Sequence, residues 1–338
     1  MFKNLLPMMV LGLSLSGYAF AADEKPVEKK KEGQSSMKIE EASGQKNKVA
    51  GDIDEEITNA KLRAESGSKS KWSLSFTTNY NGASLEKPFD KNRPNTNQDP
   101  TPPQVSMSGT FGARMRMNKH ESLSLGTGYS MRRPFHGATD GEVVDPYVSY
   151  DNAGKIGKVQ NIFSASLTAS TAKDELAIGS QGTLGLSDVL MYDFSGSRFS
   201  VGFATELSYT KFQDDKNALA HYTGDSEMFT VGTQQLDANI GLYPLMEYAF
   251  NDRINLRTVF RPLIFDHSVI KTADGQPGWS KRRWTQSVGV GIAATRDIFL
   301  YPNFQFDWYQ WRGDDYNFFR SNTRANSTVA LSATLNIF

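Results

Sequence analysis

Residues 105–132 read VSMSGTFGARMRMNKHESLSLGTGYSMR, and this stretch decides the fold class. Most odd positions are apolar, among them Phe111 and Leu125, whereas the even positions carry serine, glycine, threonine, arginine or another polar residue. Side chains on a strand point alternately to opposite faces, so the pattern predicts two strands that each have one apolar and one polar face. The polar segment 118–120 predicts a tight turn between them. Each strand has about ten residues or more, the length that a tilted strand needs to cross a bilayer.

The same period of two recurs along the rest of the chain. It predicts further strands at 72–80, 142–150, 157–171, 175–190, 197–211, 229–250, 254–265, 281–294, 298–311 and 326–338. We therefore predict an all-β fold over 71–338, a transmembrane antiparallel up-and-down β-barrel of about twelve strands, with roughly ten or fourteen left open.

The connections between the predicted strands are of two kinds. Tight turns at 118–120, 251–253 and 296–297 contrast with long polar stretches at 81–103, 212–228, 266–280 and 312–325. Bacterial barrels have short periplasmic turns and longer outer loops. If the tight turns are periplasmic, an even number of strands places both ends of the barrel on the periplasmic side.

A soluble β-sandwich is the main alternative fold. Strands of globular proteins are usually about five or six residues long, which is shorter than those predicted here. Aromatic residues also recur near the predicted strand ends, where a bilayer interface favours them and a water-facing sheet does not. They are Trp72, Tyr80, Tyr129, Tyr209, Phe250, Trp284 and Trp308.

Residues 1–21 have the form of a secretory signal peptide. Lys3 supplies a positive charge, Leu5–Leu15 is an apolar core, and the small residues Ala19 and Ala21 predict cleavage after Ala21. The apolar core is too short to cross ~30 Å of hydrocarbon as a helix. We therefore expect export across the inner membrane without retention by a helix.

The segment 22–70 differs in composition from everything that follows. It contains no aromatic residue and is rich in charge, so we expect a mostly disordered periplasmic tail. A short helix is predicted at about 53–66, because Asp52 and Glu55 form a capping-box pattern and Gly67 is suited to a helix end. Two positions are open for this helix, either free in the periplasm or inserted into the barrel as a plug.

Composition excludes several classes of function. The chain has no cysteine, which removes disulfides, thiolate metal sites and cysteine nucleophiles. Its 37 basic residues balance 37 acidic ones, so no electrostatic footprint for nucleic acid is present. Only 38% of the residues are apolar, which fits a barrel because only alternate strand residues face lipid.

The last predicted strand ends the chain. Val329, Leu331 and Leu335 alternate with small or polar residues, and the chain ends on Phe338. This segment resembles the C-terminal assembly signal of Gram-negative outer-membrane β-barrel proteins of the porin-like class, and it indicates no single family. One feature departs from that signal, because the polar Asn336 is in phase with Phe338. The resemblance implies a place in the outer membrane, contact with its lipid, and recognition of this strand by the barrel-assembly machinery.

The polar faces of the predicted strands carry more arginine than carboxylate. Opposed charges inside a closed barrel resemble the constriction of porins, and an excess of fixed cations favours anions. The alternative is that the charges pair and fill a lumen with no open pathway. The predicted channel-lining residues are Arg114, Arg116, Arg132, Arg257, Arg261, Arg283, Glu206, Glu247 and Asp307.

Catalysis has little support in the sequence. The histidines, which are His120, His136, His221 and His267, fall in predicted turns or loops without metal-ligand spacing. Asp214 and Asp215 end one predicted strand, and Asp266 with His267 ends another, which loosely resembles the rim of omptin surface proteases.

We predict no enzyme activity, cofactor or metal, and a pore for passive diffusion of small hydrophilic solutes with weak anion preference. A structural or surface-interaction barrel is the alternative, and a surface hydrolase at the rim is the third.

Overall fold

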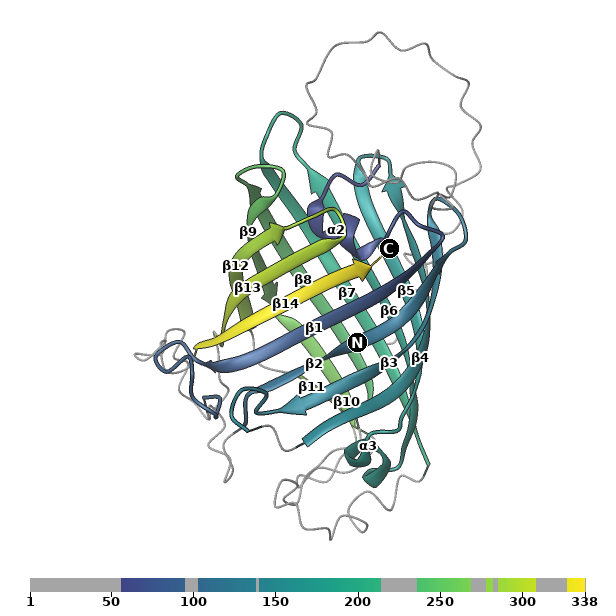
Figure 1. The fold of residues 1–338 in the computed structure, drawn as a ribbon, viewed down its shortest axis with the longest axis vertical. Coiled ribbons are helices and arrows are strands. Elements are labelled where there is room, and N and C mark those ends of the chain that lie inside the picture. The colour runs from purple at the N-terminus through teal and green to yellow at the C-terminus, as the bar shows by residue number, and fades with distance from the viewer. Residues whose placement is uncertain are drawn as a thin grey trace. The chain divides into compact units, whose positions relative to one another are not determined.

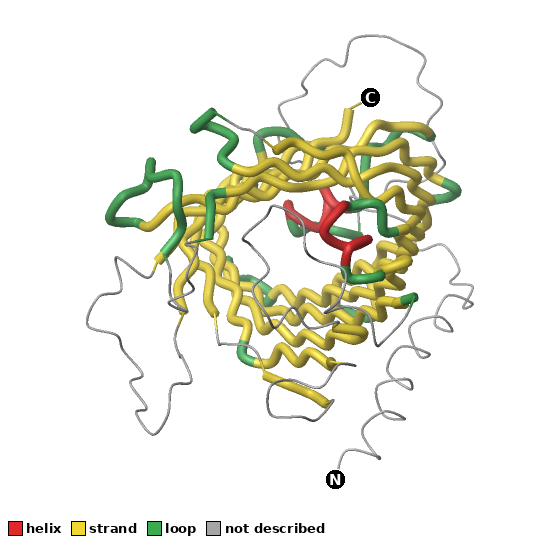
Figure 2. Tube along the Cα trace, turned by 90° about the horizontal axis from the view of Figure 1, so that it is seen from below, coloured by secondary structure: helices red, strands yellow, loops and turns green. Residues whose placement is uncertain are grey.

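The computed structural model describes residues 56–94, 103–137, 140–213, 236–268, 278–281, 285–307 and 327–337, all within one compact unit, Lys48–Phe338. Their strands form one antiparallel sheet that closes into a ring (Figures 1 and 2). The strands are β1 (Trp72–Ser84), β2 (Ser106–Arg116), β3 (Glu121–Arg132), β4 (Asp140–Ile156), β5 (Val159–Ala169), β6 (Ser180–Asp193), β7 (Phe199–Phe212), β8 (Leu236–Ala249), β9 (Ile254–Arg261), β10 (Leu263–Ser268), β11 (Gly278–Lys281), β12 (Thr285–Ala293), β13 (Ile298–Asp307) and β14 (Ser327–Ile337). Two short helices, α2 (Ala60–Glu65) and α3 (Lys173–Ala177), complete the described elements.

The prediction of a closed antiparallel barrel with twelve strands is confirmed. β14 pairs with β1, and β9 pairs with β8, so the ring has no open edge between these strands. Two positions of the ring are each built from two strands. β9 and β10 both pair with β8 and are separated by Pro262, which has no N–H to give to the ladder. β12 pairs with β9 and β11 pairs with β10, so these four strands occupy two positions of the barrel.

The outer face of the barrel is apolar, as the alternation predicts. Phe111, Leu125, Val290 and Leu331 all expose their side chains on this face. Residues of opposite parity, such as Arg114, point into the lumen and are buried there. The assignment of strand faces is therefore confirmed at these positions. No helix among the described residues is long and apolar enough to cross a membrane.

The barrel has two different ends. Short connections at 117–120, 157–158, 194–198, 250–253 and 294–297 lie at one end, which we call the turn end. The longer connections lie at the opposite end, which we call the loop end, and they include the segment that carries α3 (Figure 1). β1 begins and β14 ends at the turn end, because the number of antiparallel positions is even. In Figure 1, α2 is near the turn end.

The fourth and fifth strands differ from their predicted bounds. β4 runs to Ile156, and the chain then turns at residues 157–158 into β5, whereas the pattern had ended the fourth strand at 150. β4 contains Pro146, a residue that strands rarely accept, and the β3–β4 register shifts beside it. Asp145 has φ +54 at this shift, and a bulge is a place where a strand accepts proline.

The predicted strand 175–190 was wrong at its start. Residues Lys173–Ala177 form α3, and β6 begins only at Ser180. The Asp145 carboxylate accepts hydrogen bonds from the backbone N–H groups of Thr171 (2.8 Å) and Ala172 (3.1 Å), which turns the chain away from the β5 ladder. A run of good helix formers follows and completes a single turn of helix.

Candidate functional site

The lumen at the turn end contains residues 56–67, which we call the plug. Its helix, α2, begins later than predicted, at Ala60, and Asp52 and Glu55 of the predicted capping box lie outside the described residues. The N-cap is Asn59, whose side-chain oxygen accepts from the N–H groups of Lys61 and Leu62, both at 3.1 Å. The helix start is therefore fixed by Asn59, a cap that the sequence pattern did not single out.

Apolar contacts hold the plug on one side. Ile57 and Leu62 are almost completely buried, in a cluster with lumen-facing side chains of the barrel. The other members of the cluster are Ala153, Ile162, Met191, Tyr243, Leu245 and Val259. These two plug residues therefore cover apolar side chains that an unoccupied lumen would expose to water.

A second set of apolar contacts holds the opposite side of the helix. Ala64 packs with Ala293, Phe299 and Tyr301 of β12 and β13. Small side chains on the helix and on β12 let the two backbones approach closely. Of the two positions considered for this helix, the contacts show the inserted one.

Gln160 anchors the chain just before α2. Its Oε1 accepts from the N–H groups of both Thr58 and Asn59, at 2.8 Å each. Asp193 takes part in the same contact, because its Oδ2 accepts from Thr58 Oγ1 at 2.8 Å and its Oδ1 accepts from Ser200 Oγ at 2.7 Å. Gln160 therefore satisfies two backbone donors at the start of α2 that have no acceptor within the helix.

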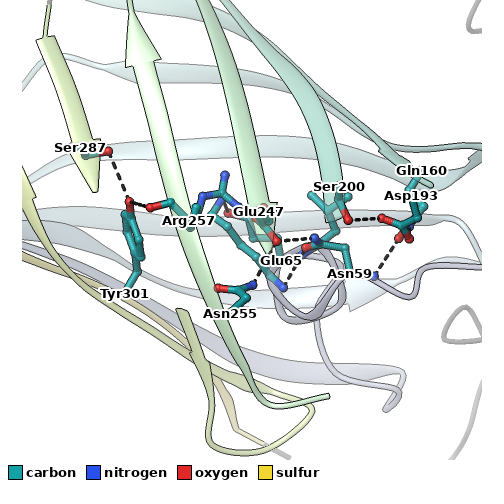
Figure 3. Close-up of polar contacts among 12 residues, drawn as sticks. Asn59, Glu65, Gln160, Asp193, Ser200, Glu247, Asn255, Arg257, Ser287 and Tyr301 are labelled. Atoms are coloured by element: carbon teal, nitrogen blue, oxygen red, sulfur yellow. Dashed lines mark hydrogen bonds and ion pairs between the residues drawn. The ribbon is translucent and has the colours of Figure 1, made fainter. Parts of the chain in front are cut away.

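Glu247 is at the centre of the network drawn in Figure 3. Its Oε2 accepts from Asn59 Nδ2 at 2.8 Å and from Asn255 Nδ2 at 3.0 Å, and its Oε1 forms an ion pair with Arg257. Arg257 lies with its guanidinium 5.9 Å from the centre of the Tyr301 ring. The buried Glu247 carboxylate therefore accepts from two amide groups and one guanidinium, and these bonds offset the cost of burying its charge.

Arginine side chains hold the other end of the plug. Arg114 donates to the carbonyl oxygen of Glu65 at 2.8 Å and to Asp151 Oδ2 at 3.2 Å. Arg116 donates to the carbonyl oxygens of Ser66 (3.1 Å) and Gly67 (3.4 Å). The last carbonyl groups of a helix lack partners within the helix, and cations there also complement its dipole.

Gly67 is required at this point for two reasons. Its φ is +83, and a Cβ atom there would lie 2.8 Å from Arg114 Nε.

Two further side chains of the barrel bind the end of the plug. Asn336 of β14 does so through its Nδ2, which donates to the carbonyl oxygen of Ala64 at 2.7 Å. Arg296, in the turn between β12 and β13, also donates to the carbonyl oxygen of Gly67. The polar residue that departs from the usual C-terminal signal thus contacts the plug.

The remaining predicted channel-lining residues lie apart from the plug or outside the described part. Arg261 lies over the Tyr243 ring, 5.7 Å from its centre, and the Tyr243 hydroxyl donates to Glu206 Oε2 at 2.9 Å. Arg132 ends β3 at the loop end. Asp307 is the last residue of β13, and Arg283 lies outside the described residues.

Sequence reasoning assigned no site role to several residues of the plug network, namely Asn59, Asp151, Gln160, Asp193, Asn255, Arg296 and Asn336. Gln160, Asp193 and Asn336 lie on polar faces at the turn ends of their strands, so strand parity could have placed them in the lumen. Their contact with the plug had no signal in the sequence.

The rim pairing considered for catalysis needs Asp214 and Asp215 as well as Asp266 and His267, and the structure describes only the second pair. Asp266 accepts from Asn239 Nδ2 at 2.7 Å, and His267 Nδ1 lies 2.6 Å from Asp237 Oδ1. Asp214 and Asp215 lie outside the described residues. No group of three histidine or acidic side chains in the described ranges is placed to hold a metal ion.

No family model matches the chain, and no curated protein matches it. Solved structures with the barrel form do match. The NanC porin is 10% identical, with 78% of this chain and 99% of that chain covered and a TM-score of 0.40. An outer membrane channel from Pseudomonas putida F1 is 9% identical, with 81% and 98% covered and a TM-score of 0.49. Salmonella typhi OmpF is 9% identical, with 81% and 99% covered and a TM-score of 0.35.

At these values the likeness concerns the barrel form in general. The residues of this chain build a polar interior whose turn end is occupied by a short segment of the same chain.

Proposed function

We propose that the chain is a passive, non-catalytic pore for small hydrophilic solutes in the outer membrane, with its turn end in the periplasm. The observation that carries the proposal is the contrast between the two faces of one closed sheet. Leu125 and Phe111 expose apolar side chains outward, while Ser124 and Arg114 of the same strands face the lumen. Such a sheet is suited to lipid outside and to water inside.

The expected passage is narrow. A barrel of twelve strands has a backbone radius of roughly 12 Å, and side chains reduce this by several ångströms on every side. The plug reduces the passage further at the turn end. We therefore expect permeation of small solutes at a rate that the plug limits.

Swelling of proteoliposomes in isosmotic sugars tests this proposal. Purified protein should admit small sugars and exclude large oligosaccharides, and a variant that lacks residues 22–66 should swell faster. Absence of swelling in both proteins would contradict the proposal.

A structural barrel without a pathway is the second candidate. The density of bonds between the plug and the barrel favours it, because Gln160, Arg114, Arg116 and Asn336 each bind the plug backbone. The same swelling assay separates the candidates. A structural barrel predicts no swelling with or without residues 22–66.

We further propose weak anion preference. Arg261 contacts the ring of Tyr243, and this contact leaves its positive charge in the lumen. Glu206 and Asp151 also face the lumen, so the preference should be small. The reversal potential in a salt gradient should indicate it, and high salt should reduce it through screening. A strong preference for cations in the unmodified protein would contradict it.

We also propose that β14 is the strand recognised by the assembly machinery. β14 closes the barrel by pairing with β1 as well as with β13, and this position supports the proposal. Phe338 lies outside the described residues. Removal of Phe338 should lower the yield of assembled barrel in the outer membrane, measured by heat-resistant migration on gels.

A further inference from the structure

A cavity of about 420 Å³ lies beside the plug at the turn end. One side is formed by the plug and the other by the connections β6–β7 and β8–β9 with the adjoining strand ends. Its lining residues are Thr58, Asn59, Ala60, Arg63, Asp193, Ser197, Arg198, Ser200, Glu247, Ala249, Asn251, Asp252, Arg253, Ile254 and Asn255. The cavity is therefore the space at this mouth that the plug borders and does not fill.

Arg63 is the charged residue that α2 contributes to this lining. The other two charges of the helix neutralise each other, because Lys61 and Glu65 form an ion pair. Arg63 forms no ion pair or side-chain hydrogen bond within the described part of the chain, and its Nε atom is buried without a partner there. An enclosed atom cannot touch a solute, so the donors that Arg63 offers to the cavity are the terminal nitrogens of its guanidinium, which have no acceptor among the described residues. Water or a solute has to supply that acceptor.

The carboxylates of the lining are already engaged or exposed. Both oxygens of Asp193 accept hydrogen bonds from plug and barrel groups, and Glu247 is ion-paired with Arg257. Asp252 is exposed on the β8–β9 turn, where solvent screens its charge. The free hydrogen-bonding capacity of the cavity is therefore mainly that of donors.

Two more guanidinium groups lie around the same cavity. Arg198 and Arg253 are exposed at its edge, where solvent screens their charge as it screens that of Asp252, and Arg198 Nη1 donates to the carbonyl oxygen of Phe250 at 3.1 Å. Arg63 is therefore the cation on which binding in the cavity mainly depends. Arginine presents several donors in a planar fork that matches the oxygens of carboxylate and phosphate groups.

We propose that this cavity is a binding site for small anions that carry a carboxylate or phosphate group, with Arg63 as its central cation. The proposal rests on the proposed function, because it names the class of solute that the periplasmic mouth retains. It also gives the plug a second role. The plug narrows the mouth and supplies the charge that selects the solute.

Calorimetric titration of the purified full-length protein with inorganic phosphate tests the site directly. Loss of one charge-assisted contact should weaken binding about tenfold or more in Arg63→Gln. Arg63→Lys should retain part of the affinity, because it keeps the charge and loses the fork. The matched control is Lys61→Gln, which removes one positive charge from the same helix away from the cavity lining and should bind as the unmodified protein does.

Absence of phosphate binding by the unmodified protein, or equal binding by Arg63→Gln, would overturn the proposal. Equal weakening in Lys61→Gln would overturn it as well, since general helix charge would then be the cause. Because calorimetry requires no permeation, these results are separate from the swelling assay. If the protein admits sugars and binds no phosphate, the proposed pore function is supported and the proposed anion site is wrong.

Discussion

The two short helices described in this chain are similar in length, but they differ in the contacts that stabilise them. α2 has six residues and α3 has five. α2 has a side-chain cap at Asn59 and buries Leu62, whereas α3 has no side-chain cap and leaves Leu176 55% exposed. An isolated helix of either length is unstable in water, because nucleation costs more than a few hydrogen bonds return. The difference teaches that α2 exists because the barrel lumen provides its partners.

The difference has a consequence for function. A helix that depends on the barrel can be released by changes in the barrel, and under the proposed function we expect such a release to widen the passage at that end. A helix in a loop, such as α3, has no such coupling to the passage.

The largest effect is expected from Leu62→Arg. Leu62 is 1% exposed within the apolar cluster, and an unpaired charge cannot be buried there. The plug should leave the lumen, and single-channel conductance should rise several-fold. Leu176→Arg in α3 is the matched control and should leave conductance unchanged. Equal conductance of the Leu62→Arg and Leu176→Arg variants would contradict the claim that α2, and not α3, restricts the passage.

A smaller effect is expected from Gln160→Leu. The N–H groups of Thr58 and Asn59 would lose their acceptor, at about 1–3 kcal/mol for each unsatisfied group. The plug should open more often, which limited proteolysis near residue 60 would detect as faster cleavage. Ser166→Ala is the control, since Ser166 lies on the same face of β5 as Gln160 and further toward the loop end. Faster cleavage in the control would show that the barrel and not the plug was weakened.

Asn336→Ala should have a still smaller effect. It removes one hydrogen bond to the carbonyl oxygen of Ala64, worth about 0.5–1.5 kcal/mol. Cleavage near residue 60 should be faster than in the unmodified protein and slower than in Gln160→Leu. Cleavage as fast as in Gln160→Leu would contradict the expectation that Asn336 stabilises the plug less than Gln160 does.

The smallest effect is expected in α3. Leu176→Ser changes an exposed side chain and keeps the backbone carbonyl that accepts the C-cap hydrogen bond of α3, so stability should stay within about 0.5 kcal/mol. Heat-resistant gel migration and conductance should both match the unmodified protein. A clear loss of either would show that α3 has structural support beyond its own loop.

The barrel could be predicted because its pattern is local. Alternation places Phe111 outward and Arg114 inward within one strand, and no distant residue has to be known. The start of β6 could not be predicted, because it depends on the bonds of Asp145 to Thr171 and Ala172. The end of β4 at Ile156 could not be predicted either, because it depends on pairing with β5. These contacts form only when β4 and β5 are paired.

The candidate site was predictable in part. Parity assigned Arg114, Arg116, Arg257 and Glu247 to the polar face, and in the structure all four are buried. Arg114, Arg116 and Glu247 bond the plug, and Arg257 pairs with Glu247. Their binding to the plug was not predictable, since Gln160 and Asn59 are about a hundred residues apart and share no sequence pattern. The capping-box pattern also predicted a helix start at Asp52, upstream of Asn59, the residue that caps the helix.

The central claim is that residues 56–67 restrict a pore that the barrel otherwise forms. Single-channel recording of the full-length protein beside a variant lacking residues 22–66 tests this most directly, with heat-resistant gel migration to show that both barrels are folded. We predict discrete conductance in both proteins and a several-fold higher value in the deletion variant. Equal conductance in two folded barrels, or no conductance in either, would contradict the claim.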